Sequence, residues 1–285
     1  MKFLNGLRPS HDLTYNDVFM APSRSAVSSR LDVDLRTPDA VGTTIPIVAA
    51  NMTAVAGRRM AETIARRGGV AILPQDIPLD VVAETIGRVK RAHTVFETPI
   101  VVAPADPVAH VLPLLGKRAH HLAVVADQGK PVGLITERDC IEVDRFSSVA
   151  EAMSTYVPPV SEDTSLSDAF ELMEARHIDA VPVVAGEALI GLLTRRGILR
   201  SAIYSPALDP DGHLMVGAAV GINGDVADKA RSVLASGADV LVMDTAHGHQ
   251  ERMIEALGLA VEARDRHAEA TGRRIPIAAG NVVTA

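Results

Sequence analysis

Polar residues follow a short hydrophobic run in the segment Val240–His249 (VLVMDTAHGH). The run is typical of a buried strand, and the carboxyl ends of strands are where βα barrels bind their ligands. A carboxylate at Asp244 can accept hydrogen bonds from both neighbouring hydroxyls of a ribose, and Thr245 can add a further contact. Alternatively, Asp244 and Thr245 cap the helix that follows. His247 and His249 could also ligate a metal, but no further ligands are obvious nearby, so we expect no metal site.

Two other hydrophobic runs end in residues suited to binding. In the segment 275–282, Gly280 lets a ligand approach the backbone, and the Asn281 amide can donate and accept hydrogen bonds. The alternative is a turn in which asparagine tolerates an unusual conformation. In the segment 49–53, Ala50, Asn51 and Met52 could receive a planar base, although a methionine is also a common core residue.

The elements that must position these residues alternate between strands and helices. Hydrophobic periodicity predicts strands at 45–50, 69–74, 214–220, 240–243 and 275–279, and helices at 58–67, 80–91, 225–236 and 250–268. Repeated βα units joined by short loops indicate an α/β fold, either a (β/α)8 barrel or an open doubly wound sheet.

An internal repeat interrupts this alternation between about residues 94 and 210. Pro99 and Val101 recur as Pro158 and Val160 at an offset of 59, whereas the motif 133–136 recurs as 191–194 at an offset of 58. We therefore expect two copies of a small β-α-β-β-α unit, with one turn residue lost between the last two strands of the second copy.

Each copy ends a strand on a threonine that could bind a nucleotide. Thr136 and Asp139 could hold the phosphate and ribose of a purine nucleotide, whereas Thr194 is followed by Gly197 where the aspartate would fall. One of the two sites is therefore expected to be weakened. Alternatively, the insert serves only assembly, and each threonine caps a helix.

The composition excludes several functional classes. The chain has 285 residues, of which 47% are hydrophobic, and carries a formal net charge of -7. No global positive charge is available for nucleic acid or an anionic membrane. The single cysteine, Cys140, cannot form an intrachain disulfide, which favours a reducing cytoplasm. No apolar stretch reaches the roughly 20 residues that span a bilayer.

Five motifs together resemble the IMP dehydrogenase/GMP reductase family. In chain order they are Leu13–Val18 (LTYNDV), Ile45–Met52 (IPIVAANM), Val216–Gly221 (VGAAVG), Asp244–His249 (DTAHGH) and Ala279–Val282 (AGNV). The repeat resembles a pair of CBS motifs, which this family inserts after the second barrel helix. The resemblance implies a TIM barrel, of which this chain carries the first five strands, with the arm and first barrel part at 1–93, the CBS pair at 94–210 and the barrel continued at 211–285.

The resemblance also implies a chemistry. Family members move a hydride between a nicotinamide cofactor, NADP(H) or NAD(H), and carbon 2 of a purine nucleotide, with a cysteine as covalent nucleophile. By position, the cofactor would be bound by Asp244, Thr245, Ala246, His247 and Gly248, and the GMP or IMP nucleotide by Ala50, Asn51, Met52, Gly280 and Asn281. The insert would bind ATP or GTP through Thr136, Asp139 and Thr194. A homo-oligomer, a tetramer or octamer, and a monovalent cation in the full-length protein are further implied.

This chain also departs from the family pattern. The nucleophilic cysteine is expected beyond Ala285, and Cys140 lies within the insert, so we expect packing for Cys140 and no turnover by these residues alone. The motif Ala50–Met52 resembles the reductases more than the dehydrogenases. We therefore predict NADPH-dependent conversion of GMP to IMP, with NAD-dependent oxidation of IMP to XMP as the alternative. A non-catalytic module for nucleotide sensing and assembly is a third possibility.

Overall fold

The computed structural model describes residues 3, 6–11, 13–118, 120–155 and 157–282, and the chain divides into two compact units, residues 1–35 and 36–285. In the first unit, Tyr15–Asp17 and Arg30–Asp32 form 3-10 turns. The backbone N–H and the hydroxyl of Thr14 both donate to Asp17 Oδ2 at 2.7 Å and hold the first of these turns. The domain boundaries expected at 93/94 and 210/211 stay predictions.

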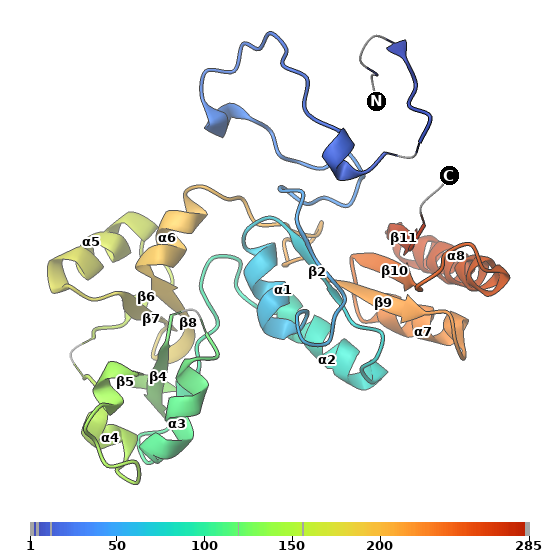
Figure 1. Ribbon diagram of the computed structural model, residues 1–285. Coiled ribbons are helices and arrows are strands. Elements are labelled where there is room, and N and C mark those ends of the chain that lie inside the picture. The colour runs from blue at the N-terminus through green and yellow to red at the C-terminus, as the bar shows by residue number, and fades with distance from the viewer. Residues whose placement is uncertain (1–2, 4–5, 12, 119, 156, 283–285) are drawn as a thin grey trace. The chain divides into compact units, whose positions relative to one another are not determined.

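The second unit contains a five-stranded parallel sheet (Figure 1). Its strands are β1 (Val48–Ala49), β2 (Val70–Leu73), β9 (Gly217–Gly221), β10 (Val240–Asp244) and β11 (Ile277–Gly280). They lie side by side in chain order, and every neighbouring pair is parallel. A doubly wound sheet reverses its strand order at a switch point, so this unreversed order fits a partial barrel instead.

A helix follows each of four strands and packs against the sheet. These helices are α1 (Arg58–Ala65), α2 (Leu79–Lys90), α7 (Val226–Ala235) and α8 (Glu251–Thr271). In α2, Val82, Ile86 and Val89 are buried because their spacing places them on one helical face. Leu73, Leu241 and Met243 of the sheet are fully buried in the same core, where each such side chain contributes roughly 1.5–3 kcal/mol.

Several elements begin or end away from the predicted positions. Only Val48–Ala49 of the predicted strand 45–50 is regular, because Ile45 N donates to Gly68 O and Ile47 N donates back to Ile45 O. The predicted strand 240–243 includes Asp244 as well. The last helix extends to Thr271 and ends at Gly272, whose φ of 73° suits a glycine at a helix terminus.

The segment between α2 and β9 folds into two similar copies of one motif, each with a three-stranded sheet. The first consists of β3 (Val101–Val102), α3 (Val108–Leu115), β4 (Leu122–Asp127), β5 (Lys130–Thr136), a 3-10 turn at Arg138–Cys140 and α4 (Val149–Ala152). The second consists of β6 (Val160–Ser161), α5 (Leu166–Arg176), β7 (Ala180–Ala185), β8 (Ala188–Thr194) and α6 (Arg195–Ser201).

The residue that the second copy lacks is not where the sequence suggested. The hairpin turns at 128–129 and 186–187 have equal length, so no residue is lost between the last two strands. The loop before the helix spans 103–107 in the first copy and 162–165 in the second, so the missing residue lies there. The hairpin length is conserved between copies because a two-residue turn sets the strand register.

Candidate functional site

A hydrogen bond joins the carboxyl ends of two strands that are not neighbours in the sheet. Asn51 Nδ2, just after β1, donates to Asp244 Oδ2 at the end of β10, at 2.7 Å. In a flat sheet these strands would lie about 14 Å apart, since three spacings of about 4.8 Å separate them. Two short side chains cannot bridge that distance, so the sheet curls and brings together the residues predicted to bind the substrate and those predicted to bind the cofactor.

The loops that follow β10 and β11 are tied together through their backbones. Thr245 N donates to Gly280 O at 2.9 Å, Asn281 N donates to Thr245 O at 2.8 Å, and Gly248 N donates to Asn281 O at 2.8 Å. A Cβ atom on Gly248 would lie 2.6 Å from Asn281 O, so only glycine fits this approach. Four predicted site residues, Thr245, Gly248, Gly280 and Asn281, therefore form one connected ledge.

The remaining predicted site residues line an accessible surface. Ala50, Met52, Ala246 and His247 are exposed, and Met52 is 59% exposed, so it is not a core residue. Asp244 is only partly buried, which leaves its carboxylate within reach of a ligand hydroxyl.

Gln250 is a site residue that sequence reasoning missed. Its Nε2 donates to Thr245 Oγ1 and to His247 O, both at 2.9 Å, and so fixes the loop after β10. Gln250 is also the N-cap of α8, which shows that the alternative of Asp244 and Thr245 as helix caps is wrong. A glutamine at the first position of the predicted helix 250–268 was the available signal.

A second missed feature is a cavity of about 350 Å³ at the carboxyl ends of β2 and β9. Gln75 and Gly221 line it. A Cβ atom added to Gly221 would clash with Gln75 Oε1. Lys229 of α7 also lines it and donates to Asn223 O at 3.0 Å. Polar residues directly after the strand at 70–73 were the sequence signal.

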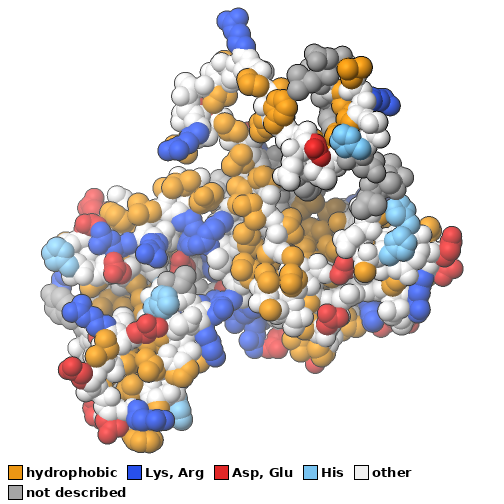
Figure 2. Space-filling view, in the orientation of Figure 1, with side chains coloured by type: hydrophobic (Ala, Val, Ile, Leu, Met, Phe, Trp, Pro, Cys, Tyr) orange, Lys and Arg blue, Asp and Glu red, His pale blue; other side chains and the backbone are white. Residues whose placement is uncertain are grey.

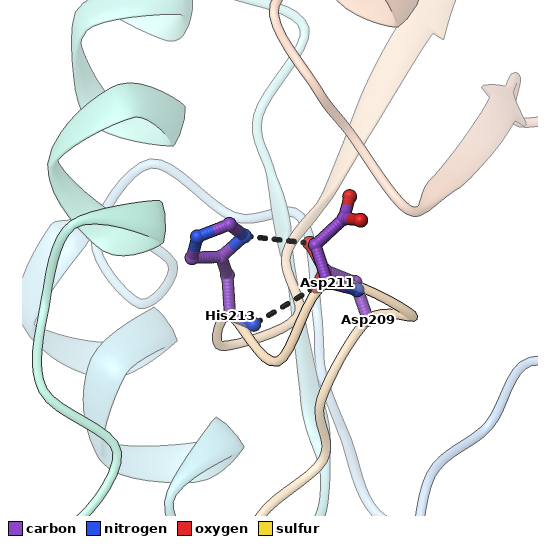
Figure 3. Close-up of side chains that lie close together, drawn as sticks. All are labelled: Asp209, Asp211 and His213. Carbon is purple, nitrogen blue, oxygen red and sulfur yellow. Dashed lines mark hydrogen bonds and ion pairs between the residues drawn. The ribbon is translucent and has the colours of Figure 1, made fainter. Parts of the chain in front are cut away.

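Potential metal ligands converge at one place among the described residues, and that place is away from His247 and His249. Asp209, Asp211 and His213 lie in the loop before β9, with ligand atoms within 4.8 Å of one another (Figure 3). Lys90 Nζ lies 2.7 Å from Asp209 Oδ2, and the backbone N–H groups of Asp211 and His213 donate to Asp209 Oδ1. Lys90 and two backbone N–H groups thus satisfy the Asp209 carboxylate. The segment 209–213 therefore has the arrangement of a structural turn.

The same lysine belongs to a buried network of charged residues at the amino end of β10. Lys90 Nζ also lies 2.6 Å from Asp239 Oδ2, and Arg273 lies 2.9 Å from Asp239 Oδ1. Burial raises the pKa of Asp239, even though Lys90 opposes the shift. Burial acts on Asp209 in the same direction, but the hydrogen bonds from Lys90 and from the His213 backbone outweigh it and lower its pKa. The network ties the end of α2 to the chain that returns from the insert.

In the insert, the two predicted nucleotide-binding threonines differ in their surroundings. Thr136 donates through its N–H and hydroxyl to Asp139 Oδ2, both at 2.8 Å, so these two residues bind each other. Thr194 is the N-cap of α6 and accepts from Gly197 N at 2.9 Å, as the capping alternative expected. Thr194 also lines a cavity of about 390 Å³, a size typical of small-molecule sites.

Cys140 is partly buried and packs against the core cluster of the first insert copy, which includes Val102 and Ile135. Burial raises the pKa of its thiol, and the charges of Asp139 and Glu137 raise it further. A nucleophilic cysteine needs the thiolate form, so this environment suits packing and not covalent chemistry.

The fold and the arrangement of side chains together define a class: a parallel βα partial barrel with a polar cluster at its strand ends and an insert of two similar copies. The model of the IMP dehydrogenase/GMP reductase domain matches residues 12–285. The chain belongs to this family.

Relatives of both branches are similar to the chain. It is 51% identical to GMP reductase of Mycobacterium tuberculosis, over 100% of this chain and 58% of that protein. It is 33% identical to inosine-5'-monophosphate dehydrogenase of Nitrosopumilus maritimus, over 96% of this chain and 57% of that protein. The chain thus spans somewhat more than half the length of these curated relatives.

A solved structure with the same fold is GMP reductase from Trypanosoma brucei in complex with guanosine 5'-triphosphate. It matches with a TM-score of 0.61 and 32% sequence identity, and the match covers 96% of this chain and 66% of that chain. Among the described residues, no helix is long and apolar enough to span a membrane.

Proposed function

We propose that the protein to which this chain belongs is a GMP reductase, which converts GMP to IMP with NADPH. The observation that carries this proposal is the 51% identity to a GMP reductase over the whole chain, against 33% and 35% to the dehydrogenases of Nitrosopumilus maritimus and Mycobacterium tuberculosis. The Asn51–Asp244 contact supports it, because it joins the two sets of residues that a hydride transfer must bring together.

The strand-end residues suit a nicotinamide nucleotide and a purine nucleotide. A bound nicotinamide cofactor supplies the hydride. Asp244 would accept from a ribose hydroxyl while its other oxygen holds Asn51, and the backbone from Thr245 to Gly248 would line the cofactor. Ala50, Asn51, Met52, Gly280 and Asn281 would contact the purine nucleotide. Asn51 would thus orient both ligands from one side chain.

The alternative reaction is the NAD-dependent oxidation of IMP. It would use the same ledge of residues, so the geometry of the site alone does not separate the two branches. The choice between them rests on the sequence motif at Ala50–Met52 and on the higher identity to the reductase. A preference of the protein for NAD and IMP over NADPH and GMP would select the dehydrogenase.

We further propose that the insert is a CBS pair that binds ATP or GTP. The cavity beside Thr194 supports this site over the Thr136 site, because Asp139 already occupies the hydrogen-bonding groups of Thr136. The non-catalytic alternative, a module for nucleotide sensing and assembly, would retain this binding and lack the ribose contact at Asp244. Assembly as a tetramer or octamer belongs to the same proposal and is testable by sedimentation in the presence of each nucleotide.

Cofactor binding by the Asp244→Asn variant tests the assignment of the ribose site. Because a hydrogen bond to a charged group contributes roughly 1.5–3 kcal/mol, we expect the variant to bind NADPH at least about tenfold more weakly. Titration of NADPH fluorescence measures the affinity. Asp163→Asn, in the exposed loop before α5, is the matched control and should bind as the wild type does. Equal affinity of Asp244→Asn and wild type would contradict the assignment.

Turnover by the 285-residue chain tests the role of its cysteine. Since Cys140 is packed in the insert with a raised thiol pKa, we expect no loss of NADPH absorbance when the chain is mixed with GMP. Measurable turnover that Cys140→Ser abolishes would overturn our account of the nucleophile.

A further inference from the structure

The side chain of Gln250 reaches from the start of α8 back to the loop after β10. Its Nε2 donates to Thr245 Oγ1 and to His247 O, both at 2.9 Å, which uses both hydrogens of the amide nitrogen. A backbone carbonyl oxygen can only accept, so His247 O determines which end of the amide faces the loop. We call this pair of hydrogen bonds, which encloses residues 245–247, the Gln250 clamp.

Gln250 occupies a position whose side chain ordinarily serves the helix. It is the N-cap of α8, but its side chain makes no capping hydrogen bond. At the same position of α5, α6 and α7, Ser165, Thr194 and Asp225 each accept from a backbone N–H of the first turn. Short side chains of this kind are the preferred caps. The glutamine leaves α8 without a side-chain cap and holds the loop instead.

The middle of the loop depends on the Gln250 clamp. The two ends of the loop are bonded to the loop after β11, through the backbone N–H groups of Thr245 and Gly248. Among the described residues, the backbone of Ala246 makes no hydrogen bond, and that of His247 makes only the one with Gln250. Without the clamp, no backbone hydrogen bond to the described part of the chain would hold these two middle residues.

The middle residues of the loop are open to a ligand. Ala246 and His247 are exposed, and histidine side chains lie at the surface beside α8 (Figure 2). The loop directly follows Asp244, to which the proposed function assigns the ribose of the cofactor. A loop that is already held in its binding conformation loses less conformational entropy when the ligand arrives. The clamp therefore favours any ligand that contacts the loop and Asp244 together.

The same clamp sets the hydrogen-bonding role of Thr245. A threonine hydroxyl can donate one hydrogen bond and accept two. Because Thr245 Oγ1 accepts from Gln250 Nε2, its own proton points elsewhere, and among the described residues this proton has no acceptor. Thr245 is only partly buried, so the proton is available to an oxygen atom of a ligand beside Asp244.

We propose that Gln250 is a positioning residue for the nicotinamide cofactor, whose amide holds residues 245–247 in the conformation that receives the cofactor and directs the Thr245 hydroxyl toward an acceptor oxygen of it. This inference rests on the proposed function and adds a residue to the same site. Gln250 acts through Thr245 and His247 and does not itself touch the cofactor. The purine nucleotide is bound from other strand ends and does not depend on the clamp.

The variant Gln250→Ser separates positioning from stability. Serine is a preferred N-cap, so the melting temperature of the variant should equal or exceed that of the wild type. Loss of the two hydrogen bonds should weaken NADPH binding about five- to tenfold, as measured by titration of NADPH fluorescence. GMP binding, measured by calorimetry, should stay within about twofold, because its predicted residues after β1 are independent of the loop.

Gln128→Ser is the matched control for this substitution. Gln128 is exposed in the hairpin turn 128–129 of the insert. The control should change neither the NADPH affinity nor the GMP affinity.

Amide hydrogen exchange locates the effect of Gln250→Ser. In the absence of ligand, residues 245–249 should exchange faster in the variant than in the wild type. Residues 251–256, at the start of α8, should exchange at the same rate or more slowly, because the new serine caps the helix. A residue that merely stabilised the helix would have the opposite pattern.

Thr245→Val tests the second hydrogen bond of the clamp. Valine has nearly the shape of threonine and lacks the hydroxyl, so this variant should bind NADPH more weakly by itself. Gln250→Ser added to Thr245→Val should cost less affinity than it does in the wild type, because the two residues act partly through one contact.

Three results would overturn the proposal in distinguishable ways. Equal NADPH affinity of wild type and Gln250→Ser would exclude the positioning role and leave the cofactor site at Asp244 standing. Equal weakening of NADPH and GMP binding, together with a lower melting temperature, would show that Gln250 only stabilises the fold. Failure of the folded wild type to bind NADPH or NADH would overturn the cofactor site and the role of Gln250 in it.

Discussion

At the scale of single residues, the candidate site depends on one glycine as much as on its polar side chains. Gly248 lies so close to Asn281 O and Val282 Cγ1 that any side chain would push the two loops apart. The ledge formed by Thr245, Gly280 and Asn281 therefore exists only while residue 248 has no Cβ atom.

Replacement of Gly248 by alanine should loosen this ledge. Overpacking of this kind costs about 1–3 kcal/mol, and we expect Gly248→Ala to lower the free energy of unfolding by that amount and to weaken NADPH binding. Urea unfolding followed by circular dichroism measures the stability.

Gly258→Ala provides the control for this substitution. Gly258 lies within α8, and no atom is within 4 Å of the position of an added Cβ. Alanine there should stabilise the protein by up to about 1 kcal/mol, because it is the better helix former. A Gly248→Ala protein as stable as wild type would show that the loops are not held as described.

At the scale of elements, the link between α2 and the insert is organised by a histidine. His93 Nδ1 accepts from the backbone N–H groups of Val95 and Phe96, at 3.0 and 2.9 Å, and its ring stacks on Phe96 at 3.7 Å between ring centroids. Only an unprotonated Nδ1 can accept these bonds. Burial lowers the pKa of His93, and the charge of Arg66 lowers it further.

Stability should consequently fall on mild acidification. Because the pKa of His93 is lowered in the folded state, the unfolded chain takes up its proton first as the pH drops below about 6.5. His120, whose pKa burial also lowers, acts in the same direction. We expect the free energy of unfolding to be constant near pH 7.5 and to decrease between pH 6.5 and 5.

The variant His93→Asn isolates the contribution of this residue. An asparagine oxygen can accept the same backbone N–H groups but does not titrate, so the variant should lose part of the decrease below pH 6.5. Denaturant titrations at pH 7.5 and 5.5 measure the difference. An identical pH dependence in variant and wild type would exclude His93 as its source.

At the scale of the whole molecule, the five-stranded sheet has two exposed edges. β1 and β11 each pair with a single neighbour, and Ile47 and Val48 beside the first edge are 52% and 60% exposed. Unpaired backbone groups next to exposed apolar side chains are a template for pairing with another chain.

We therefore expect the 285-residue chain to self-associate through these edges. Sedimentation velocity should show larger species as the protein concentration rises, and Val48→Lys should shift the distribution toward the monomer, since edge lysines oppose pairing. Ile254→Lys is the matched control, because Ile254 is 58% exposed on α8, where no strand edge is available. A chain that remains monomeric at all concentrations would contradict this expectation.

The local features of this protein were open to prediction from its sequence. Hydrophobic periodicity located all five strands of the sheet and the helices between them, because burial on one face imposes a regular spacing. The ordered motifs indicated the family, which the match over residues 12–285 confirms. The predicted start of β1 was wrong by several residues, because a backbone hydrogen bond from Ile45 to Gly68 decided where the regular strand begins.

Contacts between distant parts of the chain were decided only by the tertiary structure. The curl of the sheet brings Asn51 to Asp244, 193 positions away along the chain, and no local pattern records that distance. The same holds for Arg67 and Arg118, which line one cavity only because the end of α1 and the insert meet. Sequence periodicity reports which face of an element is buried, whereas the positions of side chains across the molecule follow from how all the elements pack at once.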